Sequence, residues 1–154
     1  MTRLEREALE CMLQLPSALT DGDADQLPET AFELPSFRAI RQGIVAAGGM
    51  AVGGAMPVAE WVSAVREQVG LALSDLVTEL AVTPLPVPSA DSVGTYATSV
   101  VLRLAELDAS RAVGAARSRM QRLAVTDPGY NEAFAELLAI EARHRALRDR
   151  LGGT

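Results

Sequence analysis

Residues 91–125, DSVGTYATSVVLRLAELDASRAVGAARSRMQRLAV, contain no proline and predict one long helix. At about 1.5 Å of rise per residue, such a helix is roughly 50 Å long, well beyond the length of an ordinary globular helix. The apolar residues of its first half follow a single helical face, which consists of Val93, Ala97, Val100, Leu104 and Leu107. We expect the rest of the chain to be arranged around this helix.

The apolar face of the long helix breaks after Leu107 and resumes at Val113, followed by Ala116, Met120 and Leu123. The step from Leu107 to Val113 turns the face by about 120°, because each residue of a helix rotates it by about 100°. Two packing partners, one for each half of the helix, explain this turn. The alternative is one helical bundle with irregular burial.

Composition and pattern together predict an all-α fold. Hydrophobic residues make up 49% of the 154 residues and aromatic residues only 4%. A core built mostly from Leu, Val and Ala is typical of helices packed on helices, and no stretch alternates as a strand does. We predict a helical bundle, followed by a long connecting helix and a C-terminal helical hairpin.

The proline and glycine positions predict the domain organisation. We expect a bundle core at residues 1–82, a proline-rich connector at 83–90, and the long helix at 91–125, whose first half packs on the bundle. Residues 126–154 then form the last helix of the hairpin, opened by Asp127 and Pro128 and closed by Gly152 and Gly153, after a connection of about four residues.

Apolar residues at helical spacing predict the bundle core. The first helix spans Thr2 to Leu15, with Thr2 and Glu5 at the spacing of a capping box. Further helices begin near Pro35 and Pro57. The side chains expected in the core are Leu9, Met12, Phe37, Ile40, Ile44, Trp61 and Leu76.

Two loops resemble ligand sites without meeting their requirements. Residues 48–57 are rich in glycine, but no Gly-Lys-Ser/Thr follows, so a flexible interhelical loop is expected instead of a phosphate-binding loop. Asp21, Asp23 and Asp25 suggest calcium, yet Phe32 stands where an EF-hand requires glutamate. We expect neither a metal site nor a cofactor.

The residue inventory argues against catalysis. The chain has one histidine, His144, and one cysteine, Cys11, which are too few for a nucleophilic triad, a zinc site or an intrachain disulfide. No apolar run is long enough for a membrane span, and the N-terminus is unlike a signal peptide, so we expect a soluble, cytoplasmic protein without membrane contact.

Charge is uneven along the chain. Residues 1–90 carry five arginines against twelve acids, whereas residues 91–154 carry nine arginines against eight acids, which gives −7 and +1 and the total of −6. This balance argues against direct binding of nucleic acid. The C-terminal arginines either form a solvated surface paired with acids or recognise an acidic protein surface.

Several stretches, taken in order, resemble the helicase-binding domain at the C-terminus of bacterial replicative primase, DnaG, especially from GC-rich bacteria. They are Leu4-Glu5-Arg6-Glu7-Ala8-Leu9, Met12-Leu13-Gln14-Leu15-Pro16, Phe32-Glu33-Leu34-Pro35-Ser36-Phe37-Arg38-Ala39-Ile40, Leu76-Val77-Thr78-Glu79-Leu80-Ala81-Val82, Pro84-Leu85-Pro86-Val87 and Arg119-Met120-Gln121-Arg122-Leu123.

The resemblance implies that the chain docks on the N-terminal domain of the replicative helicase, DnaB, and recruits primer synthesis to the replication fork. It implies a binding domain that is not itself an enzyme, although the parent primase is a DNA-directed RNA polymerase. It also implies a monomer and a contact with the acidic tail of the single-stranded-DNA-binding protein. The alternatives are the similarly folded N-terminal domain of the helicase itself and an unrelated helical adaptor.

The terminal hairpin is the predicted helicase-binding element. The last helix carries apolar residues at the consecutive positions Leu137 and Leu138, and only one of these can face the neighbouring helix, so the other remains available to a partner. The predicted helicase-binding residues are Tyr130, Phe134, Leu137, Leu138, Glu141, Arg145 and Arg148.

Overall fold

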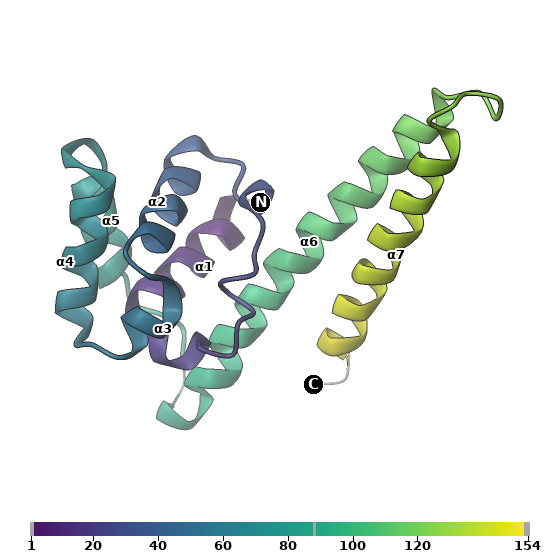
Figure 1. Ribbon diagram of the computed structural model, residues 1–154. Helices are drawn as coiled ribbons and strands as arrows, with labels where there is room; N and C mark the ends of the chain where they lie inside the picture. Colours follow the sequence, from purple (N-terminus) through teal and green to yellow (C-terminus); the bar gives the residue numbers. More distant parts are fainter. Residues whose placement is uncertain (1, 88, 153–154) are drawn as a thin grey trace. The chain divides into compact units, whose positions relative to one another are not determined.

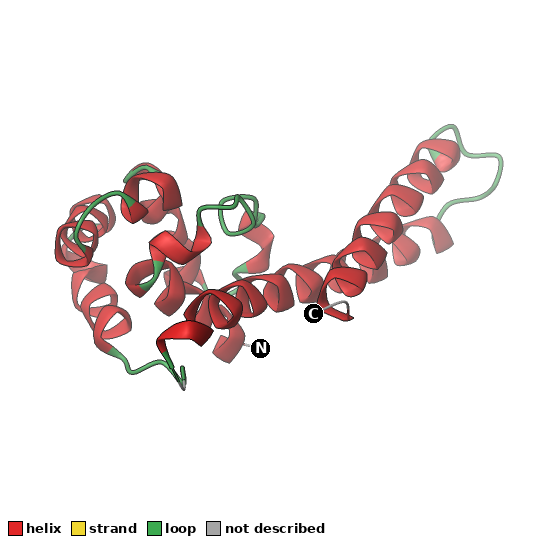
Figure 2. Cartoon of the chain, turned by 90° about the horizontal axis from the view of Figure 1, so that it is seen from below, coloured by secondary structure: helices red, strands yellow, loops and turns green. Residues whose placement is uncertain are grey.

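A computed structural model describes residues 2–87 and 89–152, and every regular element in these two ranges is a helix (Figure 2). Pro88 of the expected connector and Gly153 of the expected helix end lie outside the described residues. In chain order the elements are α1 (Thr2–Gln14), η1 (Pro16–Leu19), η2 (Glu29–Ala31), α2 (Pro35–Ala46), α3 (Gly49–Gly54), α4 (Val58–Val69), α5 (Leu71–Val82), η3 (Ala90–Ser92), α6 (Val93–Gln121) and α7 (Tyr130–Gly152), where η marks a 3-10 helix. The prediction of an all-α fold is confirmed.

The chain divides into two compact units, residues 1–104 and residues 105–154. The boundary lies inside α6, between Leu104 and Ala105, just ahead of the break in the apolar face after Leu107. α6 runs through this boundary, and through Gly114, as one continuous helix. The finer domain bounds given above stay a prediction, and each unit is described here by itself.

The first unit is built around α1, which contacts α2, α4 and α5 (Figure 1). Six of the seven side chains expected in the core are buried, and this group consists of Leu9, Met12, Phe37, Ile40, Ile44 and Trp61. The prediction for Leu76 was wrong, because α5 directs Val77 and Leu80 into the core and leaves Leu76 half-buried.

Prolines end α1 and α5, and side chains from other helices satisfy the carbonyl groups that these prolines leave without a partner. The carbonyl of Met12 would bond to the N–H of residue 16, but Pro16 has none, and the indole Nε1 of Trp61 donates to it at 3.0 Å. Gln14 Nε2 donates to the carbonyl of Leu80 at 2.9 Å, because Pro84 has no N–H to donate to it. The helix ends and the core therefore depend on each other.

The glycine-rich stretch 48–57 is not the flexible loop that the sequence predicts, because it contains the short helix α3. The Met50 side chain of α3 is fully buried. A Cβ on Gly53 would lie 2.6 Å from ring atom Cε2 of Trp61, so glycine allows this helix to lie directly on the indole. Tertiary packing here outweighs the low helix propensity of glycine.

Two buried charged side chains hold loops of the first unit. Glu5 Oε1 accepts the N–H groups of Glu33 and Leu34, at 2.7 and 3.2 Å, just before α2 begins. The expected capping box thus gives way to a contact between distant segments.

Arg41 Nη2 donates to the carbonyls of Ala24, Asp25 and Leu27 at 3.1, 3.1 and 3.2 Å, which fixes the acidic loop that had suggested calcium. Across the described residues no three His, Cys, Asp or Glu side chains are placed to hold a metal ion.

The second unit is a helical hairpin formed by the C-terminal part of α6 and by α7 (Figure 1). Residues 122–129 connect the two helices, which is longer than the connection of about four residues that was expected. α7 begins at Tyr130 instead of Pro128, because Asp127 Oδ2 accepts the N–H of Ala124 at 2.6 Å and shapes the turn. None of the described helices combines the length and the apolar character that a membrane span needs.

Candidate functional site

α7 packs within its unit through residues spaced alternately three and four apart. Leu137 belongs to this packing stripe, whereas Phe134 does not: Ala133, one residue earlier, takes the buried position. This stripe has the spacing of a coiled-coil seam. Its members are all buried or half-buried, and they are Tyr130, Ala133, Leu137, Ile140, His144, Leu147 and Leu151.

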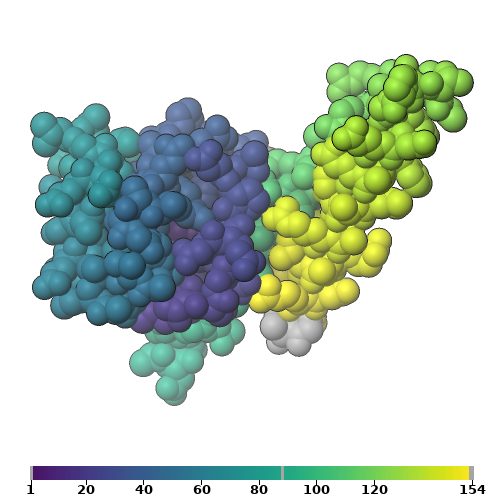
Figure 3. Space-filling view, viewed as in Figure 1, coloured from purple at the N-terminus to yellow at the C-terminus, as the bar shows by residue number. Residues whose placement is uncertain are grey.

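Two large apolar side chains on α7 remain at the surface. Phe134 is 47% exposed and Leu138 is 52% exposed, and they lie one helical turn apart. In the space-filling view α7 forms the yellow ridge at the surface of its unit (Figure 3). Of the consecutive pair, Leu137 therefore points toward α6 and Leu138 points away from it. An exposed Phe–Leu pair on a rigid helix is a suitable anchor for a protein partner.

Polar pairs join the two helices of the hairpin on both sides of the packing stripe. Arg117 Nη2 lies 2.9 Å from Glu141 Oε2, and His144 Nε2 lies 2.7 Å from Glu106 Oε1. Arg119 pairs with Glu136 in the same way. Pairs at the surface each contribute about 0–1 kcal/mol, so the apolar stripe remains the main source of stability.

A cleft of about 370 Å³ lies between α6 and α7. The α7 residues that line it begin at Glu141, three residues after Leu138 of the exposed apolar pair. Gly114 leaves room on the α6 side, since a Cβ there would meet no atom within 4 Å. On the α7 side the exposed guanidinium groups of Arg145 and Arg148 line the cleft, and neither pairs with an acid in the described chain. The cleft is lined by Ser110, Val113, Gly114, Arg117, Glu141, His144, Arg145 and Arg148.

The structure brings most of the predicted site residues onto one face of α7. Five of the seven follow steps of four and three residues along that face, namely Phe134, Leu138, Glu141, Arg145 and Arg148. Tyr130 and Leu137 turn toward α6 and are half-buried. The predicted helicase-binding residues did not include Arg117, which the sequence placed only among the C-terminal arginines. Pairing the two helices antiparallel about residues 122–129 could have placed it opposite Glu141.

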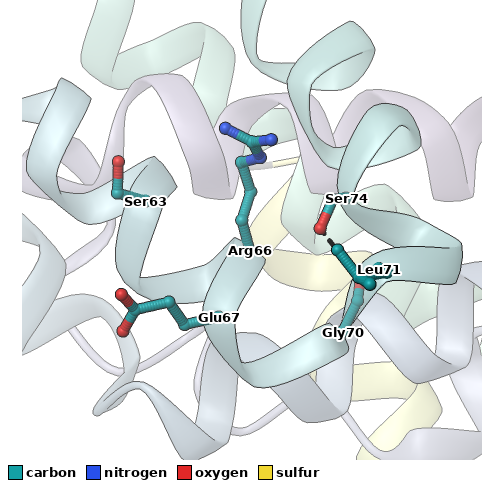
Figure 4. Close-up of a pocket in the computed structure, with 6 residues that line it drawn as sticks. All are labelled: Ser63, Arg66, Glu67, Gly70, Leu71 and Ser74. Carbon is teal, nitrogen blue, oxygen red and sulfur yellow. Dashed lines mark hydrogen bonds between the residues drawn. The ribbon is translucent and has the colours of Figure 1, made fainter.

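A second hollow lies at the turn between α4 and α5, and its polar side chains do not converge on a common point (Figure 4). Ser74 Oγ donates to the carbonyl of Gly70 at 2.9 Å, so its hydroxyl serves the start of α5. Arg66 and Glu67 extend in different directions, and Leu71 is 96% exposed at the rim. We therefore place the candidate site on the hairpin.

Comparison with a known family agrees with the resemblance in the sequence. The model of the family described as DNA primase DnaG DnaB-binding matches residues 5–139 of this chain. The match includes all of the first unit from Glu5 onward and α7 as far as Ala139. It favours a primase domain over the N-terminal domain of the helicase and over an unrelated adaptor.

Similar proteins include two mycobacterial primases and one solved domain. The DNA primase of Mycolicibacterium smegmatis is 34% identical over 152 residues, and that of Mycobacterium leprae is 35% identical over 152 residues. Each alignment covers 97% of this chain but 23% of the relative, so the chain spans about a quarter of the length of these relatives. The helicase binding domain of primase from Mycobacterium tuberculosis is 31% identical, with a TM-score of 0.76 over 99% of this chain and 94% of that domain.

Proposed function

We propose that this chain, which belongs to the DNA primase DnaG DnaB-binding family, docks on the N-terminal domain of the replicative helicase DnaB. Docking recruits primer synthesis by the parent primase to the replication fork. The observation that carries the site is the exposed pair Phe134 and Leu138 on α7. The name of the M. tuberculosis neighbour supports the same partner.

The geometry of the hairpin suits such docking for a physical reason. Full burial of a Phe or Leu side chain contributes about 1.5–3 kcal/mol, and a few apolar anchors surrounded by charge commonly dominate a protein interface. Phe134 and Leu138 are anchors of this kind, and Glu141, Arg145 and Arg148 continue their face. Because the hairpin presents these groups on a helix, little conformational entropy is lost on binding.

The test is a calorimetric titration of the helicase N-terminal domain into the wild-type chain and into the double variant Phe134→Ala/Leu138→Ala. We expect the double variant to bind at least about tenfold more weakly, since each truncated anchor costs more than about 1 kcal/mol. Leu71→Ala is the control, because Leu71 is a leucine of the first unit that is even more exposed than Leu138, at 96%. Normal binding by the double variant together with weak binding by Leu71→Ala would move the site to the turn between α4 and α5.

We also infer a second partner, the acidic C-terminal tail of the single-stranded-DNA-binding protein. The second unit holds eight arginines. An arginine beside an apolar surface can bind a carboxylate that lies next to an apolar side chain. A fluorescently labelled tail peptide tests this contact by anisotropy. Absence of binding at about 50 mM salt, where screening is weak, would refute it.

The chain alone is proposed to be a monomer. Its large apolar residues are mostly used inside the two units, and the exposed apolar pair on α7 is small for a stable homodimer interface. Size-exclusion chromatography with light scattering checks this point. A ring or dimer at micromolar concentration would favour the behaviour of a helicase N-terminal domain instead.

A further inference from the structure

We infer that the cleft between α6 and α7 receives an acidic segment of the helicase N-terminal domain, with Arg145 and Arg148 as the groups that bind its carboxylates. This inference rests on the proposed function and adds a specific chemistry to it: the partner contributes negative charge beside the apolar contact. It also adds a contribution from α6, whose Gly114 and Arg117 shape the cleft.

The charge pattern of the cleft points to a carboxylate ligand. Glu141 neutralises Arg117 across the cleft, with 2.9 Å between Nη2 and Oε2. Arg145 and Arg148 line the same cleft and form no ion pair with any described acid. Two unpaired guanidinium groups on one wall can bind a carboxylate through two parallel hydrogen bonds, which a lysine pair could not do with the same geometry.

The position of the cleft fits a partner that also covers the apolar pair. Arg145 follows Leu138 by two helical turns on the same face of α7, a distance of about 10 Å along the axis. One partner helix or turn can therefore cover Phe134 and Leu138 and place an acidic side chain at the cleft. Gly114 keeps the opposite wall open, because no side chain projects from that position of α6.

The same observations disfavour nucleic acid as the ligand. Residues 105–154 carry eight arginines against seven acids, so the hairpin has almost no net positive charge to attract a phosphate backbone. Phe134 is the one large exposed aromatic side chain of the described hairpin, whereas a single strand requires a series of stacking platforms. A short acidic protein segment needs only the two free arginines.

Charge reversal is the first arm of the test, carried out on the full chain. The variant Arg145→Glu/Arg148→Glu is compared with Arg103→Glu/Arg122→Glu, which has the same net charge. Both control arginines are exposed, Arg103 on α6 and Arg122 directly after its last residue, and each donates to a carbonyl of α6, that of Ser99 or Ser118. We expect the cleft variant to lose at least about tenfold in affinity for the helicase N-terminal domain, with a weaker salt dependence, and the control to stay within about twofold.

Filling the cleft without changing charge is the second arm. Gly114→Leu places a side chain in the cleft, and Gly94→Leu places the same side chain in open space in the first unit. We expect Gly114→Leu to weaken helicase binding by at least about fivefold and Gly94→Leu to leave it unchanged, because steric exclusion from a binding cleft prevents the contact. Circular dichroism confirms that both variants keep their helices.

The outcomes separate this inference from the proposed function. No binding by the wild-type chain would refute the function and the inference together. Normal binding by both cleft variants would overturn the inference alone and leave docking through Phe134 and Leu138 in place. Equal or tighter binding of a single-stranded oligonucleotide to the wild-type cleft would overturn the assignment of the helicase as its occupant. The same holds if Arg145→Glu/Arg148→Glu loses binding of the acidic tail peptide but keeps normal binding of the helicase.

Discussion

Gly53 lies so close to the indole of Trp61 that a Cβ on the glycine would come within 2.6 Å of ring atom Cε2. Since both residues are buried in the first unit, neither neighbour can move away at low cost. We predict that Gly53→Ala lowers the free energy of unfolding by about 1–3 kcal/mol, the usual cost of overpacking a core. Urea denaturation followed by circular dichroism measures it.

Gly114→Ala is the control for this prediction, because it makes the same change in a helix with open space around it. Alanine restricts the unfolded chain more than glycine does, so this variant should be more stable by about 0.5–1 kcal/mol. A loss of stability in Gly114→Ala equal to that in Gly53→Ala would show that the close contact with Trp61 is not the cause.

The hydrogen bond from Trp61 to the Met12 carbonyl can be tested apart from the packing of the ring. Trp61→Phe keeps an aromatic ring but leaves this carbonyl without a donor, since Pro16 has no N–H to replace it. We expect a loss of about 1–3 kcal/mol for Trp61→Phe and about 3–5 kcal/mol for Trp61→Ala. Equal stability of the phenylalanine variant and the wild type would show that solvent satisfies the carbonyl.

Cys11 offers a prediction about pH and thiol reactivity. Burial raises the pKa of the Cys11 thiol from 9.0 to about 12, because the thiolate would lose its hydration. The folded state therefore favours the protonated thiol. Its stabilising contribution is complete below pH 9 and declines as the pH rises from 9 toward 12.

The measurement is thiol labelling with a chromogenic disulfide at pH 8, in buffer and in denaturant. We expect labelling to be slow in the native chain and rapid after unfolding. Between pH 9 and 11 the free energy of unfolding should fall less in Cys11→Ala than in the wild type, because the variant lacks the thiol whose pKa is raised by folding. Rapid labelling of the native chain would contradict the burial of this side chain.

Local signals in the sequence were sufficient for most helix positions. Pro35 and Pro57 stand at the starts of α2 and α4, and helical spacing identified Trp61 as a core residue. The failures depend on contacts between distant segments. The helix α3 exists because Gly53 fits against Trp61, and Glu5 caps the start of α2 instead of its own helix.

The candidate site was predictable in part for the same reason. Helical spacing and the consecutive pair Leu137 and Leu138 indicated that α7 keeps an apolar residue for a partner, and Leu138 is exposed in the structure. The spacing could not decide between Ala133 and Phe134 for the buried position, because both fit a helical stripe. Arg117 could be found only by placing the two helices in register, which depends on the turn at residues 122–129.

The last prediction concerns the hairpin as a whole. Deleting residues 126–154 removes α7, and with it both apolar anchors and the two free arginines of the cleft. The core residues of the first unit, such as Trp61 and Leu104, precede the deletion, and their unit ends at residue 104. We therefore expect the truncated chain to keep the cooperative unfolding of the first unit and to lose helicase binding below detection.

Calorimetric titration of the helicase N-terminal domain into the truncated chain decides the matter, with thermal unfolding as the check on folding. The deletion exposes the packing face of α6, including Val113 and Ala116, so a detergent-free light-scattering measurement must first show that the sample is not aggregated. If the truncated chain aggregates, the further substitution Val113→Gln makes this exposed face more polar. Undiminished affinity in a soluble, folded truncation would place the docking surface on residues 1–125 and refute the role assigned to α7, because the truncated chain lacks every residue of that helix.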